Sequence, residues 1–244
     1  MSYEVRRTGG TDQSSQKYLI TVPEGVHPKA AVALVLDWVT AYELLHHAAH
    51  IKAGDRIFVH ALSGAVGGAM LRLGQLQGAQ VFGTASPKKH EELRKLGAVP
   101  FDYSNKDWIP VIQKLGGVNA AFDPLGYESF DESYSILGKG GVLVGYGMNL
   151  PSWTNRPSRP IIPSVLKLFS MNLFFWSGKR TTFFGVRRGS KSFEPALKQL
   201  FEWLREGKIS VPIKAIFKLD EIRSAHREYA GGSGMGSIII EVAS

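Results

Sequence analysis

The sequence predicts an α/β fold in which helices cover both faces of a doubly wound parallel sheet. Three observations support this prediction. Short β-rich apolar runs alternate with helical segments between residues 56 and 147, the first run ends in a glycine-rich turn, and that turn leads directly into a helix. Alternation at these spacings is typical of βαβ units. With 244 residues and 44% hydrophobic residues, the chain can bury the core of one large domain, with or without an appended piece.

The elements expected from the pattern follow in a regular order. A polar, Gly/Ser-rich start over residues 1–17 precedes a short strand at 18–23 and helical segments that end near residue 50. Pro87 and Gly97 are the start and stop signals of one later helix. The remaining alternation predicts strands at 56–61, 80–85, 99–103, 118–124 and 140–147, and helices at 65–77, 87–96, 106–115 and 127–137.

The regular alternation ends after Gly147. Residues 161–176 are strongly apolar but contain Lys167 and are too few to span a bilayer comfortably. We interpret them as a buried or dimer-interface helix and strand, in preference to a segment that docks on a membrane surface. The chain then predicts a helix at 194–206, a strand at 214–219, a helix at 220–232 capped by Asp220, and a last strand at 237–242.

Composition excludes several classes of site. There is no cysteine, which excludes disulfides, thiolate zinc sites and a cysteine nucleophile. A net charge of +8 with no nucleic-acid motif favours an enzyme with a polyphosphate ligand over a nucleic-acid-binding protein. No secretory signal segment is apparent, so we expect a cytoplasmic protein. His46 and His50 lie four residues apart on one helix face, but no further ligand completes a metal site, and we expect none.

The turn after the first central strand has the spacing of a phosphate-binding loop. It reads HALSGAVGGAM, from His60 to Met70. Gly64 and Gly67 take the second and third glycine places of a G-x-G-x-x-G loop, and Leu62 stands in the first. Glycines let a pyrophosphate approach the backbone, and the helix N-terminus supplies N–H groups. Such a turn is weak evidence by itself, because glycines there also serve packing.

The end of the next strand indicates which dinucleotide would bind. It reads GTASPKK, with no acidic residue before Glu91. NAD sites carry a carboxylate for the ribose 2′-hydroxyl, whereas NADP sites lack it and carry cations for the 2′-phosphate. Ser86, Lys88 and Lys89 supply a hydroxyl and two positive charges. Lysines also oppose the dipole at a helix start, which favours NADPH over incidental surface lysines.

An ordered set of segments carries a family resemblance. They are GDRIFVHALSGAVGGAMLRLGQLQGAQVFGTAS, KLGAV, FDY, AAFDPLG and LGKGGVLVGYG, preceded by VPEGVHPKAAVALVLDWVTAYELL and followed by GKISVPIKAIFKLDEIRSAHREYAGGSGMGSIII. They resemble the zinc-independent medium-chain dehydrogenase/reductase superfamily, in its quinone oxidoreductase-like branch, over about residues 18–242. That family's loop is A-x-x-G-x-x-G, which Ala61, Gly64 and Gly67 match. The resemblance implies a Rossmann-type sheet.

The resemblance also implies cofactor contacts. Thr40 would lie near the nicotinamide, and Ser86 and Lys89 would hold the 2′-phosphate. The pyrophosphate would be held by Ser63, Gly64, Ala65 and Val66, and Tyr103 would lie beside the adenosine phosphate. The nicotinamide ribose would be contacted by Leu125, Gly145 and Tyr146, and the nicotinamide pocket would be closed by Phe183 and Phe184. Among tyrosines that could protonate a developing enolate (Tyr42, Tyr127 and Tyr146), we favour Tyr146, because ligands bind at the carboxyl ends of strands.

Two departures from the family pattern bear on function. The family tail usually reads Gly-Lys before its last strand, whereas this chain has Gly236 and Ser237. The family also begins with a GroES-like barrel that forms the other wall of the active-site cleft, and most of it has no counterpart here. We therefore expect a remnant of that domain with its strands at 1–35, a dinucleotide-binding domain at 36–192 and closing elements at 193–244.

Three functions stay open on the sequence alone. The first is NADPH-dependent reduction of an enone or quinone in a small hydrophobic molecule by direct hydride transfer. The second is a non-redox cyclase or isomerase that uses an opened cleft, and the third is a non-catalytic NADPH-binding protein. Because the strands at 18–23 and 237–242 would lack their usual partners, we expect a homo-oligomer.

Overall fold

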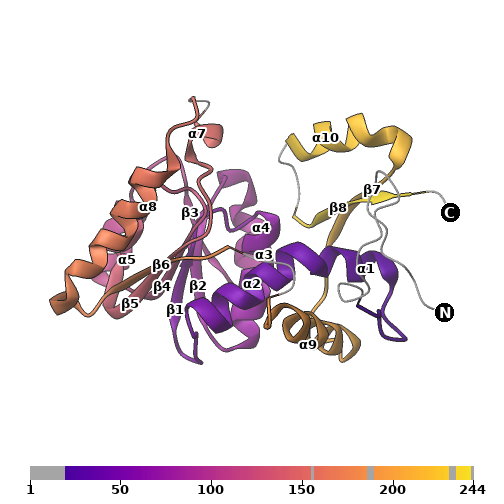
Figure 1. Cartoon of the computed structure of the whole chain (residues 1–244), viewed down its shortest axis with the longest axis horizontal. Helices are drawn as coiled ribbons and strands as arrows, with labels where there is room; N and C mark the ends of the chain where they lie inside the picture. Colours follow the sequence, from indigo (N-terminus) through magenta and orange to yellow (C-terminus); the bar gives the residue numbers. More distant parts are fainter. Residues whose placement is uncertain (1–19, 155–156, 186–189, 231–234, 243–244) are drawn as a thin grey trace. The chain divides into compact units, whose positions relative to one another are not determined.

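Figure 1 shows a computed structural model of the chain, which describes residues 20–154, 157–185, 190–230 and 235–242. The polar start at 1–17 and the first two residues of the expected strand at 18–23 lie outside this range. The chain forms two compact units. The sheet unit contains residues 44–63 and 70–186, and the terminal unit contains residues 1–43, 64–69 and 187–244.

The sheet unit is built on six strands that are all parallel, as the alternating pattern predicts. Their order is β3-β2-β1-β4-β5-β6, so the chain winds outward in both directions from β1 and β4. This order confirms the doubly wound, Rossmann-type fold. The strands are β1 (Arg56–Val59), β2 (Gln80–Ala85), β3 (Val99–Asp102), β4 (Val118–Asp123), β5 (Leu137–Gly145) and β6 (Arg180–Phe183).

Helices pack on both faces of this sheet (Figure 1). On one face, Gly74 of α3 lies so close to the sheet that a Cβ atom there would stand 3.0 Å from Ile57 Cδ1. On the other face, Phe58 of β1 joins Trp108, Phe130 and Leu168 in one buried cluster. Alternate residues of a strand point to opposite faces of the sheet, so Ile57 packs against the helices on one face and Phe58 against those on the other. Burial of both faces explains why the strands read as continuous apolar runs.

The helices expected at 65–77, 87–96, 106–115 and 127–137 are confirmed, with small shifts at their ends. The helical elements that follow β1 in the chain, up to β6, are α3 (Ala65–Leu76), η4 (Pro87–Lys89), α4 (His90–Lys95), α5 (Trp108–Lys114), α6 (Glu128–Ser135), α7 (Leu150–Trp153), α8 (Ile161–Ser170), η5 (Met171–Leu173) and η6 (Phe175–Ser177). A π-helical segment, η3 (Leu44–Ala48), precedes β1. No helix among the described residues is long and apolar enough to cross a bilayer.

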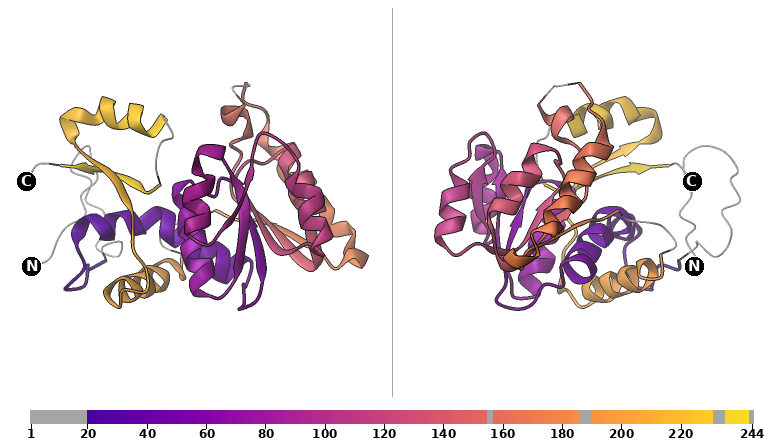
Figure 2. Two further views of the ribbon diagram at one scale, coloured as in Figure 1. Left: turned by 180° about the vertical axis from the view of Figure 1, so that it is seen from behind. Right: turned by 60° about the vertical axis from the view of Figure 1, so that its left-hand side comes forward.

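The terminal unit combines helices with a small two-stranded sheet. Its helical segments are α1 (Pro28–Ala33), η2 (Leu34–Trp38), α2 (Val39–Glu43), α9 (Phe193–Arg205), η7 (Leu219–Glu221) and α10 (Ile222–Ala230). Strands β7 (Ile213–Lys218) and β8 (Ser237–Glu241) pair in parallel, and α10 packs against both (Figure 2). α9 buries an apolar stripe formed by Phe193, Leu197, Leu200 and Phe201.

Three expectations about local structure are wrong: a strand at 18–23, a last strand that lacks a partner, and Asp220 as a helix cap. Ile20–Pro23 form no strand, because no strand of the described residues pairs with them, and the chain turns at Gly25 with φ +85°. β8, by contrast, has β7 as its partner. Asp220 is not a helix cap: it lies inside η7, where the Glu221 carboxylate accepts a 2.9 Å bond from the backbone N–H of Lys218.

The apolar segment at 161–176 also differs from its prediction. It forms α8 and two 3-10 turns, with no strand. Ile162, Leu166 and Trp176 are 72%, 64% and 71% exposed within the chain, so the expectation that the segment is buried in the chain is wrong. Within the sheet unit these side chains have no cover, and the dimer-interface interpretation stays a prediction.

Candidate functional site

The carboxyl ends of the six parallel strands meet at one edge of the sheet, and most of the expected cofactor residues lie there. Each follows or ends a different strand. In strand order from β1 to β6 they are Ser63, then Ser86, Tyr103, Leu125, Gly145 with Tyr146, and Phe183 with Phe184. Open parallel sheets bind ligands at this edge, next to the point where the strand order reverses. The fold therefore gathers residues that are up to 121 positions apart.

Lys89, in the turn after β2, also belongs to the sheet unit, whereas the other four expected residues belong to the terminal unit. Thr40 is buried in α2, and Gly64, Ala65 and Val66 open α3. Gly64 and Ala65 are exposed. Their contacts with a cofactor stay predictions.

The loop after β1 explains why Leu62 takes the place of a glycine. Ala61 has φ +58°, which turns the chain sharply out of the strand. Leu62 is fully buried, and its N–H donates a 2.9 Å bond to the carbonyl of Thr84 in β2. Gly83 makes room for it: a Cβ atom there would lie 3.1 Å from Leu62 Cβ and 2.1 Å from the carbonyl oxygen of Val59. The loop is held by its apolar side chain while Gly64 faces solvent.

The end of β2 carries the charges that the sequence singled out. Ser86 has an extended backbone, and its hydroxyl makes no helix-capping bond. Lys89 Nζ lies 2.9 Å from Glu92 Oε2, and its side chain is only 19% exposed, whereas Lys88 is exposed. The lysines occupy the 3-10 turn η4, and α4 carries Glu91 and Glu92 in its first turn. These carboxylates favour the dipole of α4, whereas Lys89, at its N-cap, opposes it as the sequence predicts.

The donor set at the end of β2 still fits a phosphomonoester. It offers one hydroxyl, from Ser86, and two ammonium groups, from Lys88 and Lys89. No carboxylate ends β2 where a 2′-hydroxyl would need one. Glu92 is the charge that a 2′-phosphate would have to displace from Lys89.

Tyr146 lies directly after β5, and its backbone N–H donates a 3.0 Å bond to the carbonyl of Asp123. Burial raises the pKa of its hydroxyl, and the charge of Asp123 raises it further. The hydroxyl can donate a hydrogen bond, as any tyrosine can at neutral pH, and the raised pKa makes it a weaker acid than an exposed tyrosine. Gly145 serves packing as well: a Cβ atom there would lie 2.8 Å from the ring of Phe130.

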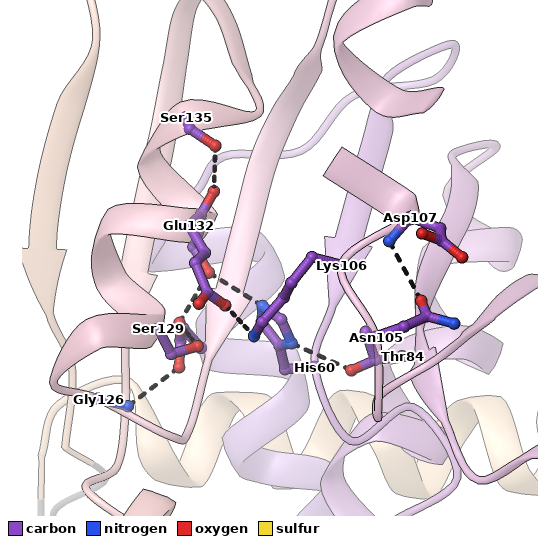
Figure 3. Close-up of polar contacts among 11 residues, drawn as sticks. His60, Thr84, Asn105, Lys106, Asp107, Gly126, Ser129, Glu132 and Ser135 are labelled. Atoms are coloured by element: carbon purple, nitrogen blue, oxygen red, sulfur yellow. Dashed lines mark hydrogen bonds and ion pairs between the residues drawn. The ribbon is translucent and has the colours of Figure 1, made fainter. Parts of the chain in front are cut away.

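A buried polar network lies at the same edge, around His60, and it was not predicted from the sequence. The imidazole of His60 lies 3.0 Å from Thr84 Oγ1 and 3.0 Å from Ser133 Oγ (Figure 3). Ser133 in turn donates a 2.7 Å bond to the carboxylate of Asp123, which also accepts from Ser129. Burial lowers the pKa of His60, although the charge of Asp123 opposes the shift. The sequence signals that point to the network are an Asp at a strand end and serines four residues apart on the next helix.

A separate hollow in the sheet unit lies away from these residues. Its volume is about 630 Å³, and it opens near Arg180, at the amino end of β6. His47, His50, Asn172 and Thr182 also line it, but no expected cofactor residue does. Asn172 is engaged in structure, because its amide bonds the backbone N–H and C=O of Thr181. The described residues contain no cluster of three or more His, Cys, Asp or Glu side chains that could hold a metal ion.

The chain is similar to a known protein family and to several curated proteins. A family model described as "Zinc-binding dehydrogenase" matches residues 96–240. The human synaptic vesicle membrane protein VAT-1 homolog is 28% identical over 94% of this chain and 61% of its own length. A probable quinone oxidoreductase from Schizosaccharomyces pombe is 27% identical over 90% of this chain and 64% of its own length.

A solved structure has a similar fold. A mycobacterial protein whose structure holds NADPH superposes with a TM-score of 0.71 at 25% identity, over 90% of this chain and 66% of that one. The chain spans less than two thirds of the length of the two curated relatives.

Proposed function

The chain belongs to the zinc-binding dehydrogenase family, as the sequence resemblance predicted, and from this premise we propose that it is an NADPH-dependent reductase of an enone or quinone group. One observation carries the proposal: residues from all six strands converge on the carboxyl edge of the sheet, with Ser86, Lys88 and Lys89 and no carboxylate at the end of β2. The quinone oxidoreductase relative supports the reaction class, and the NADPH-bound mycobacterial structure supports the cofactor.

The residues of the chain would bind and orient. Ser86, Lys88 and Lys89 would hold the 2′-phosphate through charge-assisted hydrogen bonds. The backbone after β1 would approach the pyrophosphate, since Gly64 has no side chain and is exposed. Leu125, Gly145 and Phe183 would line the opposite end. When bound, the nicotinamide supplies the hydride for an electron-poor double bond or a quinone carbonyl.

Tyr146 would act on the substrate side. Its hydroxyl, protonated at neutral pH like that of any tyrosine, would donate a hydrogen bond to the oxygen where negative charge develops. Reduction of an enone requires one hydride and one proton, and this oxygen would take the proton from Tyr146 or from water. The substrate would be a small hydrophobic molecule.

We also propose that the protein is a homo-oligomer. The exposed apolar side chains of α8 and the turns after it support a second copy as the partner.

Turnover of a quinone and of an enone, followed by the loss of NADPH absorbance, tests the proposed function. We expect turnover with NADPH and little with NADH. Tyr146→Phe should lower kcat by a larger factor than it weakens NADPH binding, because it removes only the hydroxyl and keeps the ring beside the nicotinamide ribose. If NADPH binds but neither acceptor class is reduced, the reductase proposal is wrong.

A further inference from the structure

A single buried carboxylate holds the turn that follows β4. Asp123 is fully buried, and its Oδ1 accepts 2.7 Å and 3.1 Å bonds from the backbone N–H groups of Leu125 and Gly126. The next residue, Tyr127, has φ +56°, a conformation that side-chain-bearing residues rarely adopt. A turn with such an exit needs an external restraint, and the Asp123 side chain supplies one.

The second oxygen of this carboxylate fixes its rotamer. Oδ2 accepts 2.7 Å bonds from the hydroxyls of Ser129 and Ser133, both of which lie buried on α6. Four donors therefore surround Asp123, as they would an ionised carboxylate, which only accepts. The side chain cannot rotate without breaking bonds at both oxygens.

The carboxylate also fixes the direction of every proton in the network. Ser133 has one proton, and it points to Asp123. The oxygen of Ser133 must then accept from His60 Nε2, 3.0 Å away. The neutral imidazole therefore carries its proton on Nε2, and its Nδ1 accepts from the hydroxyl of Thr84, 3.0 Å away.

The network joins two loops of the candidate site. At one end, the carbonyl of Thr84 accepts the N–H of Leu62 and so holds the loop after β1. At the other end, Asp123 holds the turn after β4 that contains Leu125. His60 lies between them, at the end of β1, and all of these groups belong to the sheet unit (Figure 3).

We infer that His60 and Ser133 are positioning residues for the nicotinamide half of the cofactor, because they lock Asp123 in the rotamer that sets the Leu125–Gly126 turn. The inference rests on the proposed function. Neither side chain reaches the cofactor: both are buried, and they act through the carboxylate and the turn that it holds. The adenosine half, bound at the end of β2 by Ser86 and Lys89, should not depend on them.

Two ligands separate these halves. NADPH has both, whereas adenosine 2′,5′-bisphosphate has only the adenosine end with its 2′-phosphate. Ser133→Ala removes one hydrogen bond to Asp123 and should weaken NADPH binding by about three- to tenfold. It should leave the affinity for the bisphosphate unchanged. Lys89→Ala should weaken both ligands.

Variants of His60 add a rescue test. His60→Leu should reproduce the effect of Ser133→Ala. His60→Gln should restore most of the affinity, because its amide can still donate to Ser133. Ser135→Ala is the matched control: it deletes an exposed hydroxyl of the same helix, which donates a 2.7 Å bond to the backbone carbonyl of Glu132. Nicotinamide fluorescence of bound NADPH should change in Ser133→Ala and stay unchanged in Ser135→Ala.

The outcomes distinguish this inference from the proposed function. If the unaltered protein binds neither ligand, the proposed function fails. If it binds both, and Ser133→Ala weakens both equally or neither, the positioning role is refuted. Thermal unfolding with each ligand identifies variants that do not fold, and His60→Gln keeps the test decisive if His60→Leu is one of them.

Discussion

Replacing Asp123 by asparagine should reverse the direction of the hydrogen bonds through the buried network. The amide oxygen can still accept from the backbone N–H groups of Leu125 and Gly126. The amide nitrogen, however, must donate to Ser129 and Ser133, whose hydroxyls donate in the unaltered protein. Ser133 would then donate to His60 Nε2, and the imidazole proton would move to Nδ1, where it donates to Thr84.

The cost of this reversal follows from the contacts. The two backbone bonds to Asp123 lose their charge assistance, at about 1 kcal/mol each, so Asp123→Asn should lower the free energy of unfolding by about 2 kcal/mol. Asp123→Leu removes the acceptor of the backbone N–H groups of Leu125 and Gly126 and of the Ser129 hydroxyl, whereas Ser133 can turn to His60 Nε2; it should cost at least about 3 kcal/mol at about 1 kcal/mol for each donor. The Asn variant should therefore fold, and the Leu variant should be less stable still.

Urea unfolding measures both costs, and ¹⁵N NMR of the His60 ring measures the proton position. We expect the Nε2–H tautomer in the unaltered protein and the Nδ1–H tautomer in Asp123→Asn. An Nδ1–H tautomer in the unaltered protein, or the same tautomer in both, would refute the reasoning about the network.

Three further predictions concern charge, pH and assembly. Glu92→Gln should free Lys89 from an exposed ion pair worth about 0.3–0.5 kcal/mol and tighten NADPH binding about twofold in calorimetry, with NADH unchanged; weaker NADPH binding would mean that Glu92 orients the lysine. Burial lowers the pKa of His60 below 6.5, so the unfolded state binds more protons there and stability should fall as pH drops below about 6.5, by at most about 1.4 kcal/mol per pH unit. In urea unfolding at several pH values, this part of the slope should vanish in His60→Gln, and identical slopes in the two proteins would contradict it. Sedimentation velocity should show a homo-oligomer that Leu166→Glu dissociates, and a monomeric unaltered protein would exclude that assembly.

Local patterns were sufficient to predict the sheet and the edge where the site lies. Apolar runs bounded by glycine turns predict β1 to β5, and in a parallel sheet the residues after each strand must share one edge. Ser86 and Lys89 were found in this way. The same reasoning reads a run such as Ile20–Pro23 as a strand, but a strand also requires a partner, which a local pattern does not contain.

Long-range contacts were beyond that reasoning. His60 gains its partners only when β1 lies between β2 and β4 and α6 packs over them, so a lone histidine before a glycine loop had no visible role. The π-helical segments within residues 34–48 have no sequence signature either. Lys89 and Glu92 are three residues apart, and their ion pair follows from that spacing. Because the two charges neutralise each other, Lys89 is not a free cation for a phosphate group unless the phosphate displaces Glu92.

Calorimetric titration with NADPH, with NADH run alongside, tests the central claim most directly. The account predicts clear binding of NADPH, weaker binding of NADH, and loss of this preference in Lys89→Ala, because only the 2′-phosphate uses that ammonium group. Absence of binding by either nucleotide would contradict the account. The glycine loop would then be a feature of ancestry alone, and a non-redox cyclase or isomerase would become the better hypothesis.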